Sequence, residues 1–230
     1  AADRAGQTDL YYTVFALDGL IALQQEFPPS LRGYLERFAD GDGLDLVHLC
    51  CLARCWAAFK QTPHDLAERL VRRINELWDH DSVYHGFLAW GALQDLGQPS
   101  AQFPLGDTLL QTTLHTAART TPTTAAAVTL LRHLGSPVPP DAVSWLLARA
   151  RPEGGFSAVE GAPMPDLLST ATALHALSGQ KISLARAKEP TLDFIDTLWT
   201  GKAFCGTWAD DEPDCEYTYY ALLAMGHLSL

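Results

Sequence analysis

The sequence predicts an all-α fold, a closed α/α toroid built from six helical-hairpin repeats. The first observation is that residues 214–222 repeat residues 9–17, with Asp, Tyr, Thr, Ala and Leu at identical offsets. The second is that the same frame recurs at a mean spacing of 41 residues, enough for two helices and their connections. The third is that the first and last copies match each other best. The end repeats of an open array are usually atypical, so this match favours a ring in which these copies are neighbours.

Each repeat is expected to begin at an anchor residue, where one helix starts, and to continue into a partner helix. The anchors stand at positions 9, 45, 81, 122, 166 and 214, and the fourth is Pro122, where the Asp of the other copies is missing. Because the segments after the anchors have helical periodicity, anchored helices are predicted near 9–25, 44–59, 81–97, 122–134, 166–178 and 214–228.

The segments between the anchors supply the partner helices. The clearest is 62–78, in which Leu66, Leu70, Ile74 and Leu77 fall on one helical face. The chain opens almost on its first anchor, so six anchored helices are expected to have only five partners. We therefore expect the first outer helix to be missing here, whether it is trimmed, disordered or absent. The other partner helices are predicted at 30–38, 107–118, 140–149 and 190–199.

An Asp opens five of the six copies, and no active site needs five equivalent carboxylates. An Asp at the start of a helix accepts hydrogen bonds from exposed backbone N–H groups of the first turn, which contributes about 1 kcal/mol. We therefore expect Asp9, Asp45 and Asp81 to be helix caps, and Asp166 and Asp214 to combine capping with a role in a site.

The composition fits one domain that spans residues 1–230. The chain is 47% hydrophobic, which is enough to bury a sizeable core. Its net charge of −11 argues against nucleic acid as a partner. No run of 18 apolar residues is present, which argues against a membrane span. The five Cys are typical of reduced thiols rather than of a disulfide framework, so we expect a cytoplasmic protein.

The motifs around the last anchors carry a family resemblance. Gly154-Gly155-Phe156, a loop, and then the pattern Asp-x-x-Tyr-Thr-x-x-Ala-Leu resemble the repeat shared by protein prenyltransferase β subunits and squalene/oxidosqualene cyclases. Residues 2–9 look much like the loop ahead of such a helix in Rab geranylgeranyltransferase β subunits. The resemblance covers nearly the whole chain and implies an α6/α6 barrel with an apolar cavity for isoprenoid chains. It is more specific for fold than for function.

The zinc site of the family does not transfer to this chain. Protein prenyltransferases resemble it at the fifth anchor, where they carry Asp-x-Cys, and at the sixth, where a His follows the Asp by three residues. Together these residues bind a zinc that activates the acceptor thiolate. Here Asp166 is kept, but Leu168 and Tyr217 stand at the other two places. We therefore expect no bound zinc and predict no cofactor, with Mg²⁺ left as the one alternative.

The diphosphate site of the family is also altered. The same enzymes place Arg and Lys ahead of the fifth anchor, whereas Glu160 and Pro163 occupy those places here. The loop before the sixth anchor is Asp210-Asp211-Glu212, and an acidic mouth repels a diphosphate unless Mg²⁺ intervenes.

Acid catalysis is the alternative chemistry that the resemblance implies. Cyclases of the second class use Asp-x-Asp-Asp at this helix start, with one Asp protonating an alkene or epoxide. The fifth copy keeps only Asp166 of this motif, and the sixth is acidic at Asp214 and Glu216. A buried Glu216 with a raised pKa would serve as the acid, whereas a solvated Glu216 would be an ordinary surface charge. The candidate catalytic residues are Glu216, Asp214 and Asp166.

The third residue after each anchor faces the cavity mouth in the family that the chain resembles. Tyr hydroxyls and aromatic faces there suit an isoprenoid or a cationic intermediate, although aromatic residues also pack between helices. The candidate ligand-binding residues are Tyr12, His48, Tyr84, Ser169 and Tyr217.

The leading hypothesis is a prenyltransferase-like toroid that binds an isoprenoid or another long apolar molecule in its central cavity, without the family zinc. One alternative is a zinc-free enzyme that uses acid catalysis, as in terpene cyclisation, although such cyclases usually have a second barrel domain. The other is a non-catalytic module that pairs with another helical subunit, as prenyltransferase β subunits do. An apolar cavity closed at one end would support the lipid hypotheses, and a filled core would support the module.

Overall fold

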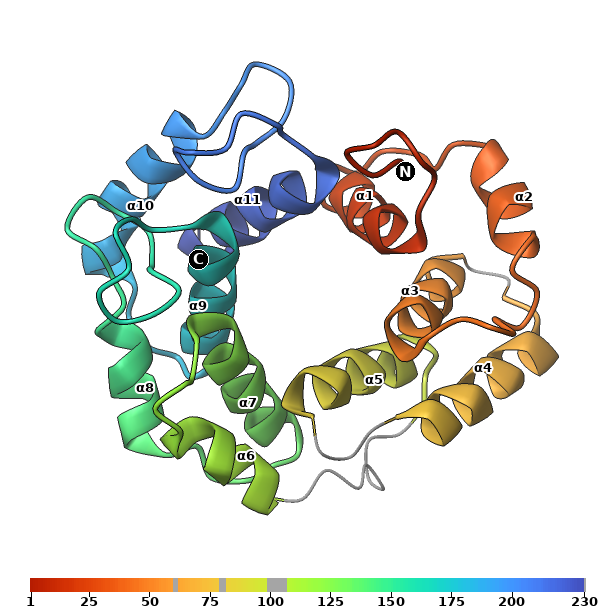
Figure 1. Ribbon diagram of the computed structural model, residues 1–230, viewed down its shortest axis with the longest axis horizontal. Helices are drawn as coiled ribbons and strands as arrows, with labels where there is room; N and C mark the ends of the chain where they lie inside the picture. The colour runs from red at the N-terminus through yellow and green to blue at the C-terminus, as the bar shows by residue number, and fades with distance from the viewer. Residues whose placement is uncertain (60–61, 79–81, 99–106, 230) are drawn as a thin grey trace. The chain divides into compact units, whose positions relative to one another are not determined.

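The computed structural model describes residues 1–59, 62–78, 82–98 and 107–229. The regular elements of these residues are eleven α-helices, joined by loops that contain only isolated β-bridges (Figure 1). The all-α class predicted from the sequence is therefore confirmed. The chain divides into two compact units, unit 1 (Ala1–Leu105) and unit 2 (Gly106–Leu230).

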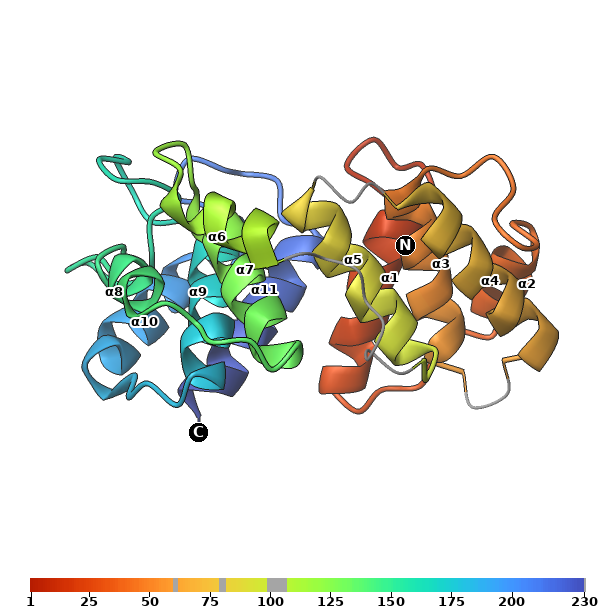
Figure 2. The same cartoon turned by 90° about the horizontal axis from the view of Figure 1, so that it is seen from below.

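Unit 1 contains three anchored helices, α1 (Leu10–Ala22), α3 (Leu46–Ala57) and α5 (Val83–Asp95). They pack side by side, α1 on α3 and α3 on α5. The partner helix α2 (Ser30–Glu36) contacts α3, and α4 (His64–Leu77) contacts both α3 and α5, so the partners cover one side of the anchored row (Figures 1 and 2).

Unit 2 repeats this arrangement with α7 (Thr121–His133), α9 (Leu167–Gly179) and α11 (Cys215–Leu228) as anchored helices. The central helix α9 packs against both α7 and α11. The partner α6 contacts α7, α8 contacts α7 and α9, and α10 contacts α11. These partners are α6 (Asp107–His115), α8 (Pro140–Leu147) and α10 (Ala185–Thr197).

Two details of the partner helices differ from the prediction. In α4, Leu66, Leu70 and Ile74 are buried as expected, but Leu77 is 45% exposed because it ends the helix. Helix α10 begins at Ala185 and contains Pro190, whereas the sequence had placed Pro190 at its start. A proline is favoured in the first turn because it has no backbone N–H to donate, but the buried Thr191, Phe194 and Ile195 hold this helix in place around it.

Carboxylates cap four of the six anchored helices, as the repeated Asp predicted. The Oδ1 atom of Asp9 accepts a hydrogen bond from the N–H of Tyr12 at 3.0 Å, and Asp45 accepts one from His48 at 2.9 Å. Asp166 and Asp214 cap α9 and α11 through the same bond, at 2.7 and 2.9 Å, to Ser169 and Tyr217.

The other two anchored helices are capped by hydroxyls rather than at the predicted anchors. Ser82 caps α5 by accepting from the N–H of His85 at 3.2 Å, and the predicted anchor Asp81 lies outside the described residues. Thr120 caps α7, two residues before the predicted anchor Pro122, and forms a capping box with Thr123. A short side chain with an acceptor oxygen is all that a cap needs, so Ser and Thr replace Asp here.

The Thr of the repeated pattern ties α9 and α11 to the loop ahead of each helix. The hydroxyl of Thr170 donates to the carbonyl of the cap Asp166 at 2.7 Å and accepts the N–H of Phe156 at 2.9 Å. Thr218 does the same in α11, donating to Asp214 and accepting from Phe204. This shared bridge explains why Thr recurs four residues after the cap.

Gly154 is required at the turn that leads into α9. Its φ angle is +97°, a left-handed conformation that favours glycine, and a Cβ there would lie 1.9 Å from the carbonyl oxygen of Pro190. The glycine therefore lets the loop ahead of α9 pass directly against α10. None of the helices described is long and apolar enough to cross a membrane.

Candidate functional site

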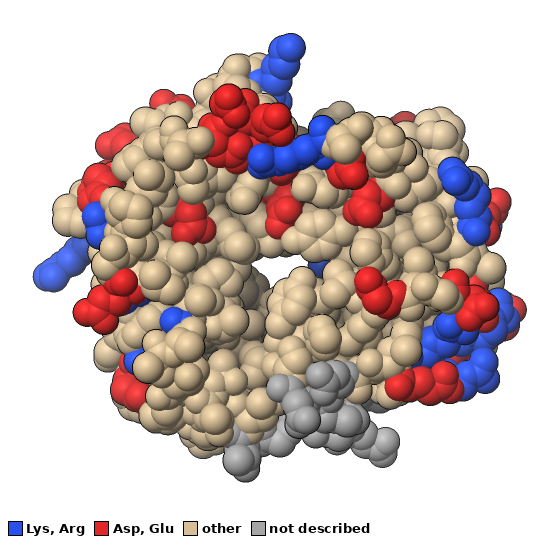
Figure 3. Space-filling view, in the orientation of Figure 1, with Lys and Arg blue, Asp and Glu red and all other residues tan. Residues whose placement is uncertain are grey.

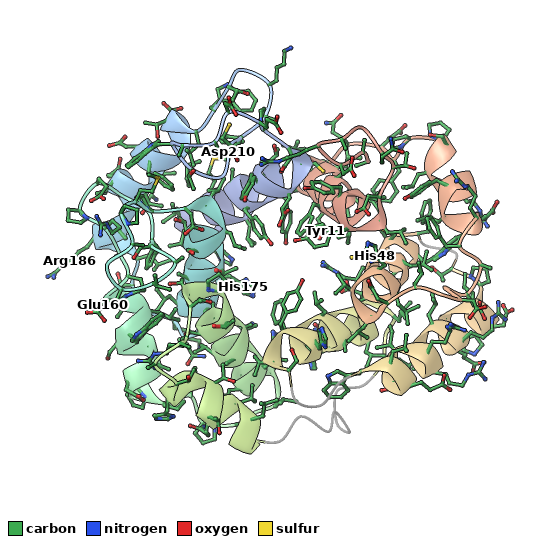
Figure 4. The ribbon with its side chains drawn as sticks, in the orientation of Figure 1. Tyr11, His48, Glu160, His175, Arg186 and Asp210 are labelled. Atoms are coloured by element: carbon green, nitrogen blue, oxygen red, sulfur yellow. The ribbon has the colours of Figure 1, made fainter. Side chains whose placement is uncertain are left out.

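The N-terminal ends of α1 and α3 bring three of the expected polar residues together in unit 1. His48 lies between the two capping carboxylates, with Nδ1 2.9 Å from Asp45 Oδ1 and Nε2 3.4 Å from Asp9 Oδ2. Figure 4 shows Tyr11 and His48 on the sides of α1 and α3 that face away from α2 and α4. The sequence placed His48 at a binding position, but it did not reveal that both caps would contact the imidazole.

The electrostatics of this cluster favour a protonated imidazole. Partial burial opposes the charge on His48, but the hydrogen bond and charge of Asp45 and the charge of Asp9 outweigh it, so the pKa of His48 is raised. The N–H of His48 lowers the pKa of Asp45 through the capping hydrogen bond, and the imidazole adds to this effect. Asp9, Asp45 and His48 therefore form one linked acid–base group at the N-terminal ends of α1 and α3.

The two tyrosines predicted to line the site differ in their surroundings. Tyr12 is half-buried, with its ring edge-on to Tyr11 at 5.7 Å between centroids. Tyr84 is 45% exposed and lies 6.0 Å from the ring of His85. Because Ser82 is the cap of α5, the third residue after the cap is His85. Tyr84 therefore stands one residue out of the frame in which the sequence had placed it.

In unit 2 the loop residue Gly206 contacts the first turns of both α9 and α11. The carbonyl of Gly206 accepts the N–H of Leu167, directly after the cap Asp166, at 2.9 Å. The ring of Tyr217 packs against the Cα of the same glycine, because a Cβ added there would lie 2.5 Å from the ring. Ser169 is fully buried in the first turn of α9, and among the described residues its hydroxyl has no hydrogen-bond partner.

The three candidate acids do not share one environment. Burial raises the pKa of Asp166, and the hydrogen bond from the backbone N–H of Ser169 only partly offsets this effect. Asp214 is half-buried and caps α11, and Glu216 is half-buried in the first turn of the same helix. A general acid needs a carboxyl that stays protonated at the working pH, and the raised pKa of Asp166 is a change in that direction.

The described residues contain no group of three or more His, Cys, Asp or Glu side chains placed to hold a metal ion. The cysteines Cys50, Cys51 and Cys55 are buried in α3, and burial raises the pKa of Cys51 to about 12, so this thiol is not a ready thiolate ligand. The absence of the family zinc, expected from Leu168 and Tyr217, stays a prediction.

Two clusters toward the other ends of the anchored helices were not predicted. In unit 1, Arg54 of α3 bridges Asp18 of α1 at 2.9 Å and Asp95 of α5 at 3.0 Å. In unit 2, His175 Nδ1 lies 3.1 Å from His227 Nε2. Asp18, Arg54 and His175 each stand nine residues after a cap, and a polar residue at that offset in an apolar helix is the signal that could have found them.

The imidazoles of unit 2 lie near the guanidinium of Arg132. Arg132 donates from Nη2 to His133 Nε2 at 2.9 Å, at the end of α7. Burial, together with the charges of His227, Arg132 and His133, lowers the pKa of His175 to about 4. Burial and Arg132 also lower the pKa of His227. Both imidazoles of the pair are therefore neutral at pH 7.

No protein-family model matches the sequence, and no curated protein is significantly similar to it.

Proposed function

We propose that this chain is a prenyltransferase-like α/α toroid that binds an isoprenoid, or another long apolar molecule, against the side of its anchored helices that the partner helices leave uncovered. In this proposal the two units close into one ring, with α1 beside α11, as the match between their sequences predicts. The ligand class comes from the resemblance of the repeats to those of protein prenyltransferases and squalene cyclases. The exposed side chains of the anchored helices support binding of such a ligand.

The observation that carries the proposal is the kind of side chain that the two sorts of helix expose. The partner α4 buries a leucine and isoleucine stripe and exposes charges such as Arg72 and Glu76. The anchored helices instead leave aromatic residues half-exposed, Tyr11 and Tyr12 in α1 and, in α11, Tyr217, Tyr219 and Tyr220. Half-exposed aromatic faces contribute apolar contact area to a ligand at a low cost in side-chain entropy.

Binding of a fluorescent isoprenoid alcohol to the purified chain tests this proposal. We expect saturable binding, which the Tyr217→Ala variant weakens by about 1–2 kcal/mol because one aromatic wall is lost. Leu77→Ala, on the exposed end of α4, is the matched control and should bind as the wild type does. Thermal unfolding of each variant separates a lost contact from a lost fold. Equal affinity of folded Tyr217→Ala and wild type would contradict the proposal at this wall.

Acid-catalysed chemistry on the bound isoprenoid is the second candidate function, and the raised pKa of Asp166 favours it. Asn caps a helix about as well as Asp but cannot donate a proton to an alkene, so Asp166→Asn separates the two roles of this residue. If Asp166 is the acid, Asp166→Asn binds the isoprenoid normally and forms no product. Glu216→Gln is the parallel test for the half-buried Glu216 of α11. Unchanged turnover in both variants would exclude these two carboxyls as the acid, and absence of any turnover in the wild type would leave a binding protein.

A further inference from the structure

A small cavity of about 290 Å³ lies in unit 2 between the end of α10 and the loop that leads to α11. Its walls include the indoles of Trp199 and Trp208 and the carboxylates of Asp210 and Asp211, and Cys205 lies buried beside them. The cavity is at the small end of the range for ligand pockets, so it suits a compact head group rather than a whole isoprenoid chain.

Both indoles are held in position although each is 46% exposed. Trp208 donates from Nε1 to the hydroxyl of Thr197 at 2.8 Å, and its ring meets Phe194 edge-on at 5.5 Å. Trp199 packs on Phe204 at 4.8 Å, across a β-bridge between the same two residues. Side chains that are fixed before a ligand arrives lose little entropy when it binds, so exposed but anchored indoles indicate a prepared surface.

The loop that carries these indoles is acidic. Residues 199–213 contain three carboxylates against one ammonium, that of Lys202. Asp210 is fixed by the backbone N–H groups of Gly206 and Glu212, each at 3.2 Å, and Asp211 is exposed. Figure 3 shows acidic side chains gathered over this part of unit 2, and Figure 4 labels Asp210 there.

Trp145 is an indole of unit 2 that already has cation–π contacts within the chain. The guanidinium carbons of Arg119 and Arg149 lie 4.6 and 4.7 Å from the centre of its ring, so cations of the chain itself already contact this indole. No Arg or Lys of the described residues stacks in this way on Trp199 or Trp208. Each of these two indoles is 46% exposed, so part of its surface is open to a cation from outside.

We propose that this cavity binds an organic ammonium head group, with Trp199 and Trp208 contacting its methyl or methylene groups and the exposed carboxylate of Asp211 balancing its charge. Tryptophan faces attract such cations through the ring quadrupole, and nearby carboxylates add a longer-range attraction. The inference is independent of isoprenoid binding because it uses none of the tyrosines of the anchored helices. A free quaternary ammonium compound and a methylated lysine side chain share the required chemistry.

Titration calorimetry with choline and with its uncharged isostere 3,3-dimethylbutan-1-ol tests the proposal on the intact chain. We expect choline to bind about tenfold more tightly than the alcohol, because the two have the same shape and differ in charge. Equal affinities, or no saturable binding of choline up to about 10 mM, would overturn the proposal. Nα-acetyl-Nε-trimethyllysine amide is the third probe, and tighter binding of it than of choline assigns the site to a modified protein side chain.

Matched variants locate the site. Trp199→Leu should weaken choline binding about tenfold, and Asp211→Asn about threefold, because one removes the aromatic face and the other a single exposed charge. Trp145→Leu and Glu160→Gln are the controls, since Glu160 is an exposed carboxylate of unit 2 that faces Arg149 rather than the cavity. Circular dichroism confirms that each variant is folded. Choline affinity that falls equally in Trp145→Leu and Trp199→Leu would refute the assignment.

Discussion

Acidification should destabilise unit 2 through the His175–His227 pair, and replacing His175 by Gln should remove much of that effect. The pKa of His175 falls from the usual 6.5 to about 4, first because of burial and then because of the charges of His227, Arg132 and His133. Since the folded protein binds this proton more weakly than the unfolded chain does, stability is highest above pH 6.5. It is lost progressively as the pH falls toward 4.

The size of the effect follows from the difference between the two pKa values. At 1.36 kcal/mol per pH unit, a fall from 6.5 to about 4 corresponds to a loss of about 3 kcal/mol in the free energy of unfolding between pH 7 and pH 4. Such a loss is a large fraction of the stability of an ordinary domain. His175→Gln should lose a roughly constant amount at every pH, from the hydrogen bond to His227, and should show a flatter pH dependence.

Urea denaturation followed by circular dichroism at pH 7, 5.5 and 4 measures this difference. His64→Gln is the matched control, because the His64 side chain is 89% exposed and its removal should leave the slope unchanged. The quantity to compare is the change in unfolding free energy with pH, not its absolute value. If wild type and His175→Gln lose the same stability between pH 7 and pH 4, the pair does not resist protonation and the reasoning is wrong.

Three further predictions concern the loops and caps. Gly154→Ala should cost about 3 kcal/mol or more, measured by thermal unfolding, because its Cβ meets a backbone oxygen and its φ is +97°; Gly161→Ala, which has a positive φ in open space, should cost less. Asp45→Ala should lose about 1 kcal/mol and Asp45→Asn little, which denaturant titration would show, whereas equal losses would exclude capping as the cause. Elemental analysis after purification without chelator should find well under one zinc per chain, and stoichiometric zinc lost in Asp166→Ala would reverse this expectation.

The sequence was most informative about features that depend on neighbouring residues. An acceptor side chain followed by an apolar 3.6-residue period is a local signal, and it located the anchored helices as well as the caps Asp9, Asp45 and Asp214. The same signal was ambiguous at the third and fourth repeats. Ser82 and Thr120 cap as readily as Asp does, so searching for Asp moved the frame by one or two residues.

Contacts between side chains of different helices could not be predicted from such local patterns. Arg54 meets Asp18 and Asp95 from 36 and 41 residues away, and nothing in the local pattern says which charges of three helices will pair. The exposed indoles were equally hidden. Phe204 takes the bridge position that Phe156 takes one repeat earlier, and Trp208 lies at the surface, 46% exposed.

The two units respond to protons in opposite ways, because the same helical frame places different partners around its histidines. In unit 1, His48 lies between Asp9 and Asp45, so its pKa is raised and its contribution to stability is complete below pH 6.5 and lost as the pH rises through the raised value. In unit 2, His175 lies among His227 and Arg132, so protonation weakens that unit as the pH falls. A moderate fall in pH therefore strengthens contacts between α1 and α3 while it weakens those between α9 and α11. The repeat determines where a side chain stands, and its neighbours on the adjacent helices determine what it contributes.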